Sequence, residues 1–168
     1  MKFVFGLREN LKSKLLDLPK EWASAFLPSK ILVVAINNNG DVVGVCGIRS
    51  VFNITTTYIY ENWRGKGLGT KMHETIVPIA KKRHLCFLLF GIYSDNVPYW
   101  DRKTSEFGSK DIVSLKKSNL KFKIFPLNFL GYIVYWSARV ITHLLPNVFW
   151  TYAAQWIHNM TVRNVRDI

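Results

Sequence analysis

The stretch Arg64-Gly65-Lys66-Gly67-Leu68-Gly69-Thr70 decides how this sequence is interpreted. It follows a β-prone run at 54–60 and begins an amphipathic helical pattern at 68–83. Three glycines at alternate positions let successive backbone N–H groups converge, and the N–H donors and positive dipole of a helix N-terminus add to them. The stretch therefore predicts a cradle for a pyrophosphate. Charge-assisted hydrogen bonds from Arg64, Lys66 and Lys71 could add to it.

Two other phosphate-binding patterns do not fit this loop. A Walker loop needs G-x-x-x-x-G-K followed by Ser or Thr, and the sequence contains no such string. The dinucleotide fingerprint needs G-x-G-x-x-G, whereas this loop is G-x-G-x-G. P-loop NTPases and Rossmann dinucleotide enzymes are thereby excluded.

Upstream of the loop, the hydrophobic pattern predicts a strand, a helical arm and a β-hairpin. Two continuous β-branched runs flank an Asn- and Gly-rich turn at 37–41, which is typical of a hairpin. The expected elements are a strand at 2–6, helices at 8–17 and 21–27, and strands at 31–36 and 42–51.

Downstream of the loop, the pattern predicts further strands. Pro78 is expected to kink or break the helix at 68–83. The expected elements after it are a strand at 85–92, a short helix from 95 to about 107 and a hairpin of 109–117 with 120–125.

Length and composition indicate one folded domain. The chain has 168 residues, 49% of them hydrophobic and 20% charged, which excludes wholesale disorder. Cys46 and Cys86 lie in apolar runs, so we expect buried thiols in a reducing compartment, with no metal site. The apolar N-terminal stretch is too short for a secretory signal, which favours the cytoplasm.

The net charge of +12 predicts an anionic partner. Phosphorylated cofactors, nucleic acid and acidic membrane surfaces all remain open on charge alone. Nucleic acid is the less favoured of these, because a basic run more often forms a solvated face. Nucleic-acid binding is suggested by five basic residues interleaved with Phe122 and Phe125, namely Lys110, Lys116, Lys117, Lys121 and Lys123.

The residues 64–69 match the R/Q-x-x-G-x-G/A signature of the GNAT N-acetyltransferase superfamily, and the order of elements over about 30–108 resembles that family too. The resemblance implies an α/β (α+β) fold with a mixed, mostly antiparallel central sheet of six to seven strands flanked by helices. We assign this domain to 1–126. It implies acetyl-CoA (coenzyme A) as the cofactor and an amine as the acceptor.

The resemblance also implies the cofactor-binding residues. Coenzyme A would lie in a V-shaped opening between strands 54–60 and 85–92. The pyrophosphate would be held by backbone N–H groups of Arg64, Gly65, Lys66, Gly67, Leu68, Gly69 and Thr70. The main chain of Ile59 and Tyr60 would pair with the pantetheine and polarise the acyl carbonyl, and Asn96 would contact the pantetheine region.

Catalysis in the family is direct attack of the amine on the thioester, which needs a base for the amine and an acid for the thiolate. Many members have a Glu on the strand before the loop and a Tyr seven residues after the Asn. In this sequence the strand at 54–60 has no carboxylate, the nearest being Glu61 directly after it, and Lys103 stands in place of the Tyr. Glu61 and Tyr99 are the nearest substitutes for base and acid, and a catalytically degenerate binding protein is the alternative.

The segment 127–168 is expected to be an aromatic helical extension, with helices at 128–145 and 148–160. Arg139 near the middle of the first argues against a membrane span. Three uses of 128–160 remain open: contact within a homodimer, peripheral contact with a membrane surface and, less favoured, cover for the cofactor. Its aromatic residues are Tyr132, Tyr135, Trp136, Trp150, Tyr152 and Trp156.

Overall fold

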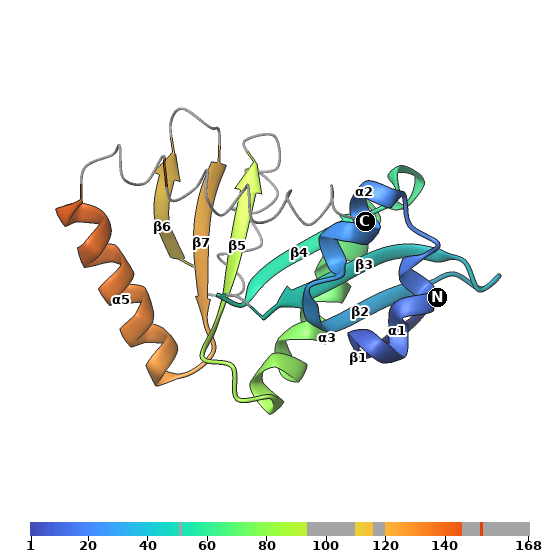
Figure 1. Cartoon of the computed structure of the whole chain (residues 1–168), viewed down its shortest axis with the longest axis horizontal. Helices are drawn as coiled ribbons and strands as arrows, with labels where there is room; N and C mark the ends of the chain where they lie inside the picture. The colour runs from blue at the N-terminus through green and yellow to red at the C-terminus, as the bar shows by residue number, and fades with distance from the viewer. Residues whose placement is uncertain (51, 94–109, 116–119, 146–151, 153–168) are drawn as a thin grey trace. The chain divides into compact units, whose positions relative to one another are not determined.

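The computed structural model describes residues 1–50, 52–93, 110–115, 120–145 and 152, in two compact units, Met1–His84 and Leu85–Ile168 (Figure 1). The helix expected at 95–107 lies outside the described residues, as does the helix expected at 148–160 except for residue 152. Each unit contains its own antiparallel strands.

The first unit contains four strands, each hydrogen-bonded to the next in chain order: β1 (Lys2–Leu7), β2 (Ser29–Ile36), β3 (Val42–Arg49) and β4 (Ile54–Ile59). The hairpin of β2 and β3 turns at Asn37, whose Oδ1 accepts hydrogen bonds from the backbone N–H groups of Asn39 and Asp41. Gly40 completes the turn at φ +93°.

Helices cover both faces of this sheet: α1 (Arg8–Leu15) and α2 (Lys20–Phe26) on one face and α3 (Leu68–Lys82) on the other. Two glycines of β3 show this arrangement. A Cβ at Gly44 would meet Met72 of α3, whereas a Cβ at Gly47 would meet Phe26 of α2. Positions separated by an odd number of residues point to opposite faces of a strand.

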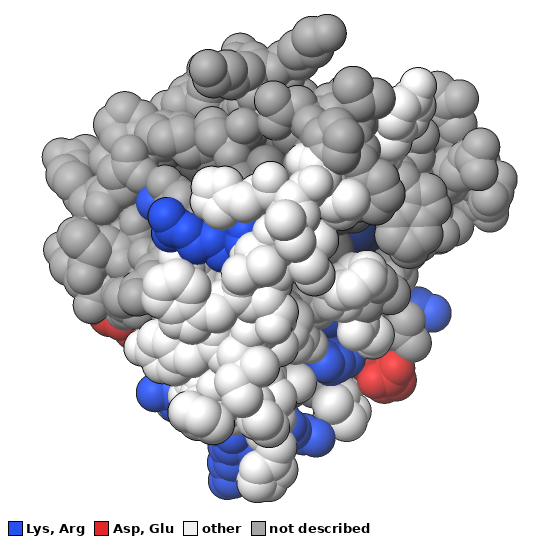
Figure 2. All heavy atoms as spheres, turned by 90° about the vertical axis from the view of Figure 1, so that its left-hand side faces the viewer, with Lys and Arg blue, Asp and Glu red and all other residues white. Residues whose placement is uncertain are grey.

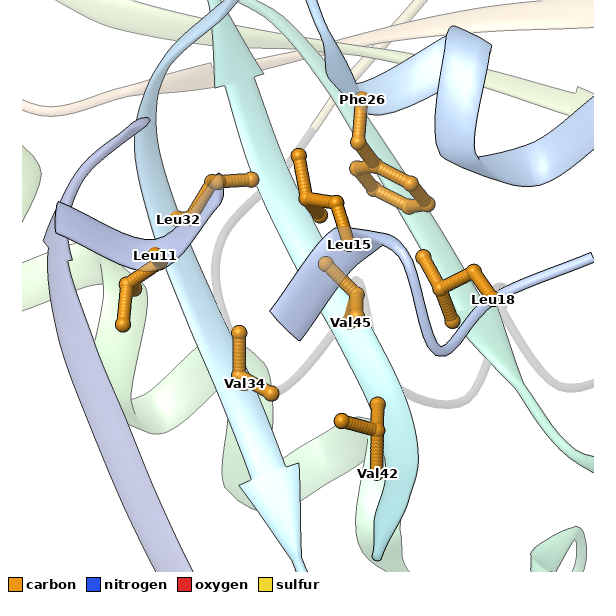
Figure 3. Packing of buried hydrophobic residues seen from close by; sticks show 8 residues of the cluster. All are labelled: Leu11, Leu15, Leu18, Phe26, Leu32, Val34, Val42 and Val45. Atoms are coloured by element: carbon orange, nitrogen blue, oxygen red, sulfur yellow. The ribbon is translucent and has the colours of Figure 1, made fainter. Parts of the chain in front are cut away.

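The core under α1 and α2 consists of apolar side chains (Figure 3). Leu11 and Leu15 of α1 and Phe26 of α2 pack on the sheet, and Leu18 between the helices joins them. Their partners on β2 and β3 are Leu32, Val34, Val42 and Val45. Leu11 and Leu15 are one helical turn apart, so they share the face of α1 that is buried on the sheet.

The second unit contains β5 (Phe87–Tyr93), β6 (Lys110–Leu115) and β7 (Leu120–Pro126), with β7 paired antiparallel to both other strands. Helix α5 (Phe129–Leu144) packs against these strands. Asn128 caps it by accepting a hydrogen bond of 3.0 Å from the backbone N–H of Gly131. A Cβ at Gly131 would overlap the carbonyl oxygen of Cys86, so the helix approaches that chain closely.

The predicted α/β fold with six to seven mostly antiparallel strands and flanking helices is confirmed. Pro78 does not break α3, which continues through this residue with the proline side chain exposed, and a kink there stays a prediction. The implied V-shaped opening and the boundary between 126 and 127 stay predictions. Among the described helices, none combines the length and apolar character that crossing a bilayer requires.

Replacing Gly131 with Ala is expected to destabilise the protein by about 2 kcal/mol, because the added methyl forces α5 away from the chain at Cys86. Urea denaturation followed by circular dichroism measures the loss. Ser137→Ala, at an exposed position of the same helix, is the control and should be neutral within about 0.5 kcal/mol. Equal stability of the Gly131→Ala variant and the wild type would contradict the close packing.

Candidate functional site

The candidate site begins where β4 ends. The backbone N–H of Tyr60 donates to the carbonyl of Val43, at 3.2 Å, which continues the pairing of β4 with β3. Backbone groups alternate in direction along an antiparallel strand, so the N–H and C=O of Ile59 point to the edge away from β3. The free backbone groups of Ile59 are therefore followed, a few residues later in the chain, by the glycine loop.

Gly65 and Gly67 give the loop its shape. Both have φ +74°, in the left-handed region that other residues adopt at a cost. A Cβ at either glycine would meet nothing within 4 Å, so these backbones border open space. The two glycines are required for conformation, and they leave the main chain accessible to a ligand.

Helix α3 begins directly at this loop, with Gly67 as its N-cap. The backbone N–H of Lys71 donates to the carbonyl of Gly67 at 3.2 Å, which closes the first turn. Gly67 has no side chain to cap the helix, and the first turn, which the structure describes in full, contains no acidic residue. The positive end of the helix dipole therefore adds to the charges of exposed Lys66 and Lys71.

Arg64 is bound to the protein itself. Its Nε donates to the carbonyl oxygen of Ile59 at 3.0 Å, and its Nη1 lies 3.5 Å from Oε1 of Glu61. The side chain of Glu61 is 84% exposed, so this ion pair is worth little in stability. The two bonds do bring Ile59, Glu61 and Arg64 together around the end of β4.

Lys66 has a contact of its own. Its Nζ lies 5.2 Å from the ring centroid of Trp63, within the range of a cation–π interaction. Trp63 is the last residue of the short 3₁₀ helix η1 (Glu61–Trp63), which connects β4 to the glycine loop. The contact orders a lysine that would otherwise move freely in solvent.

A buried polar cluster connects β3, β4 and α3, and the sequence analysis missed it. The hydroxyl of Thr57 donates to Sγ of Cys46 at 3.3 Å and shares a hydrogen bond of 3.0 Å with Nε2 of His73. Burial lowers the pKa of His73 to about 4 and raises the pKa of the Cys46 thiol to about 12. Both groups are neutral at pH 7, so the cluster fixes α3 on β4 and does not titrate there.

The structure therefore brings together all the predicted residues from Ile59 to Thr70. Within this segment Leu68 and Gly69 are buried, while the residues from Arg64 to Gly67 are exposed. Asn96 and Tyr99 lie outside the described residues. The role of each residue stays a prediction.

One family model matches more than half of the chain. The family model described as acetyltransferase (GNAT) family matches residues 6–101. Among curated proteins, no sequence matches this chain.

Solved structures resemble the chain in fold. An acetyltransferase of the GNAT family from Staphylococcus aureus is 17% identical with a TM-score of 0.53, covering 76% of this chain and 100% of its own. The ribosomal-protein-S18-alanine N-acetyltransferase from Escherichia coli is 12% identical with a TM-score of 0.56, covering 76% and 96%. An acetyltransferase structure from Salmonella typhimurium with its cofactor acetyl-CoA is 17% identical with a TM-score of 0.51, covering 76% and 94%.

Acidification is expected to destabilise the protein through His73. Because its pKa is about 4 in the folded state and about 6.5 when unfolded, the unfolded state binds the proton first. Stability is complete above pH 6.5 and falls by about 3 kcal/mol as the pH drops from 6.5 to 4.

Urea denaturation at several pH values, with wild type and His73→Gln, measures this effect. The His73→Gln variant should be less stable at pH 7. Its free energy of unfolding should also fall less between pH 6.5 and 4 than that of the wild type, because the contribution of His73 to this slope is gone. His143→Asn, at an exposed position, is the control and should keep the wild-type slope. Identical slopes in wild type and His73→Gln would contradict the prediction.

Proposed function

The chain belongs to the acetyltransferase (GNAT) family, and from this membership we propose that it is an acyl-CoA dependent N-acetyltransferase that acetylates an amine. Acetyl-CoA is the cofactor of this family. The observation that carries the proposal is the left-handed, open glycine loop at the uncapped N-terminus of α3. We place the reaction in the cytoplasm, where the two free thiols fit a reducing environment.

The loop fits the diphosphate of coenzyme A. Side chains would obstruct access to the backbone at Gly65 and Gly67, and none is present there. The helix dipole and the ammonium groups of Lys66 and Lys71 favour an anion at this position. Arg64 contributes differently, because its hydrogen bond to the carbonyl oxygen of Ile59 ties the loop to the end of β4.

The end of β4 supplies backbone groups for the acyl part of the cofactor. The N–H of Ile59 points to the edge away from β3, where it would donate to the acyl carbonyl oxygen. Bound acetyl-CoA supplies the thioester that the amine attacks. Asn96 would contact the pantetheine region of the cofactor.

Glu61 is the proposed general base. Its carboxylate is 84% exposed and lies at the end of β4, so it can accept a proton from an incoming ammonium group directly or through water. Tyr99 would donate a proton to the leaving thiolate. Small amines, amino sugars, peptide N-termini and lysine side chains are the acceptors to be tested.

Gly67→Glu is expected to weaken acetyl-CoA binding about 100-fold, because it adds backbone strain and a negative charge where the diphosphate binds. Isothermal titration calorimetry with acetyl-CoA measures the affinity. The matched control is Gly40→Glu, which has the same charge and a similarly strained backbone, at φ +93° in an open turn. It should bind as the wild type does, and equal affinity in the two variants would refute the assignment of the loop.

Glu61→Gln is expected to lower kcat/KM by about 100-fold without changing acetyl-CoA affinity, because the amide cannot take up a proton. Release of free coenzyme A in the presence of an amine panel measures turnover. Glu74→Gln, on the exposed surface of α3, is the control and should keep full activity. Full activity of Glu61→Gln would exclude it as the base. If the wild type binds acetyl-CoA and acetylates none of the amines, the non-catalytic alternative is favoured.

A further inference from the structure

Helix α5 has its apolar side turned outward. Gly131 and Tyr135 are buried against the strands of the second unit, and the side chains on the opposite side of the helix are almost all apolar. Eight apolar residues of the helix are between 45% and 77% exposed: Phe129, Leu130, Tyr132, Ile133, Trp136, Val140, Ile141 and Leu144. We call these eight residues the outer face of α5.

This orientation reverses the usual pattern of a surface helix. A helix that packs on a sheet normally presents charged residues to water. At 3.6 residues per turn, Phe129, Ile133, Trp136, Val140 and Leu144 project in similar directions and form one continuous stripe. Contiguous exposed apolar surface of this kind marks a site of interaction with a protein or a membrane.

The stretch of sequence that contains α5 carries charges of one sign. The 55 residues from Ile112 to Arg166 contain seven Lys and Arg residues and no Asp or Glu. Arg139 is exposed and donates from Nη1 to the hydroxyl of Tyr135 at 2.7 Å, which holds a cation at the border of the face. Figure 2 views the side on which α5 lies and shows Lys and Arg side chains among the white ones.

We propose that the outer face of α5 binds the surface of anionic lipid membranes. The apolar stripe would enter the boundary between headgroups and acyl chains, with the helix, about 24 Å long, parallel to the surface. Trp136 and Tyr132 are residue types that favour this boundary. Arg139 can reach lipid phosphates while its stem stays on the apolar side.

A second copy of the chain fits less well. Two copies would bring two net charges of +12 together, and a two-fold contact through α5 would place like-charged borders against each other. An anionic bilayer has an apolar acyl-chain region for the outer face and negatively charged headgroups that attract the cationic chain. The charge of the chain therefore decides between the two occupants.

Flotation of the purified full chain with vesicles tests the proposal. One set contains phosphatidylcholine alone, and the other contains phosphatidylcholine with phosphatidylglycerol. The chain should float with the anionic set, bind the neutral set far less, and lose binding as salt is raised. The double variant Phe129→Ser/Trp136→Ser should bind the anionic set about 50-fold more weakly.

The control replaces two exposed apolar residues outside α5. Leu16→Ser/Phe52→Ser removes a leucine and a phenylalanine that are 78% and 54% exposed, and should bind as the wild type does. Equal loss in both double variants would overturn the proposal, as would unchanged binding in the α5 variant.

Absence of vesicle binding also overturns the proposal, and three further measurements then identify the occupant. A dimer in light scattering that the α5 variant dissociates indicates a second copy. If the protein is a monomer and the α5 variant unfolds at a lower temperature than the wild type, another part of the same chain covers the outer face. Binding of single-stranded RNA that the α5 variant abolishes indicates nucleic acid.

Discussion

Complete burial of strand β3 is the constraint on which the first unit depends. All eight residues from Val42 to Arg49 are buried, so both faces of the sheet must be covered. The chain covers one face with α1 and α2 and the other with α3, and β4 must therefore connect to α3 through a short, sharply turning segment. The glycine loop is that segment. Its ends are held by the β3–β4 pairing and by the bond between Thr57 and His73, so the core fixes the geometry of the candidate site.

An anion at this loop could be bound by basic side chains or by backbone N–H groups, and the structure favours the backbone groups. Arg64 and Lys66 look like phosphate ligands in the sequence, but Arg64 bonds to Ile59 and Glu61, and Lys66 lies over Trp63. These contacts orient the side chains within the protein. The main chain at Gly65 and Gly67 and the N-terminus of α3 remain turned toward open space. A preorganised backbone of this kind recognises the shape of a diphosphate and adds little conformational entropy cost to binding.

The parts of this molecule that follow local rules were predictable. Alternate glycines between a strand and a helix predicted the loop, and the β-branched runs around an Asn- and Gly-rich turn predicted the hairpin of β2 and β3. The Thr57–His73–Cys46 cluster was not predictable, because its members are far apart in sequence and meet only after β3, β4 and α3 pack. The outward apolar face of α5 was hidden for a similar reason. The pattern predicted an aromatic helix, but its orientation depends on the close approach of Gly131 to Cys86.

The openness of the glycine loop makes the fold more tolerant of mutation than the binding site is. A substitution at Gly65 or Gly67 meets no neighbouring atoms, so its cost to folding is limited to backbone strain of about 1–2 kcal/mol. A stable domain survives that cost. The same change alters the main chain that would hold the diphosphate. Under relaxed selection, descendants of this chain would lose cofactor binding well before they lost their structure, and would persist as folded proteins with a new role.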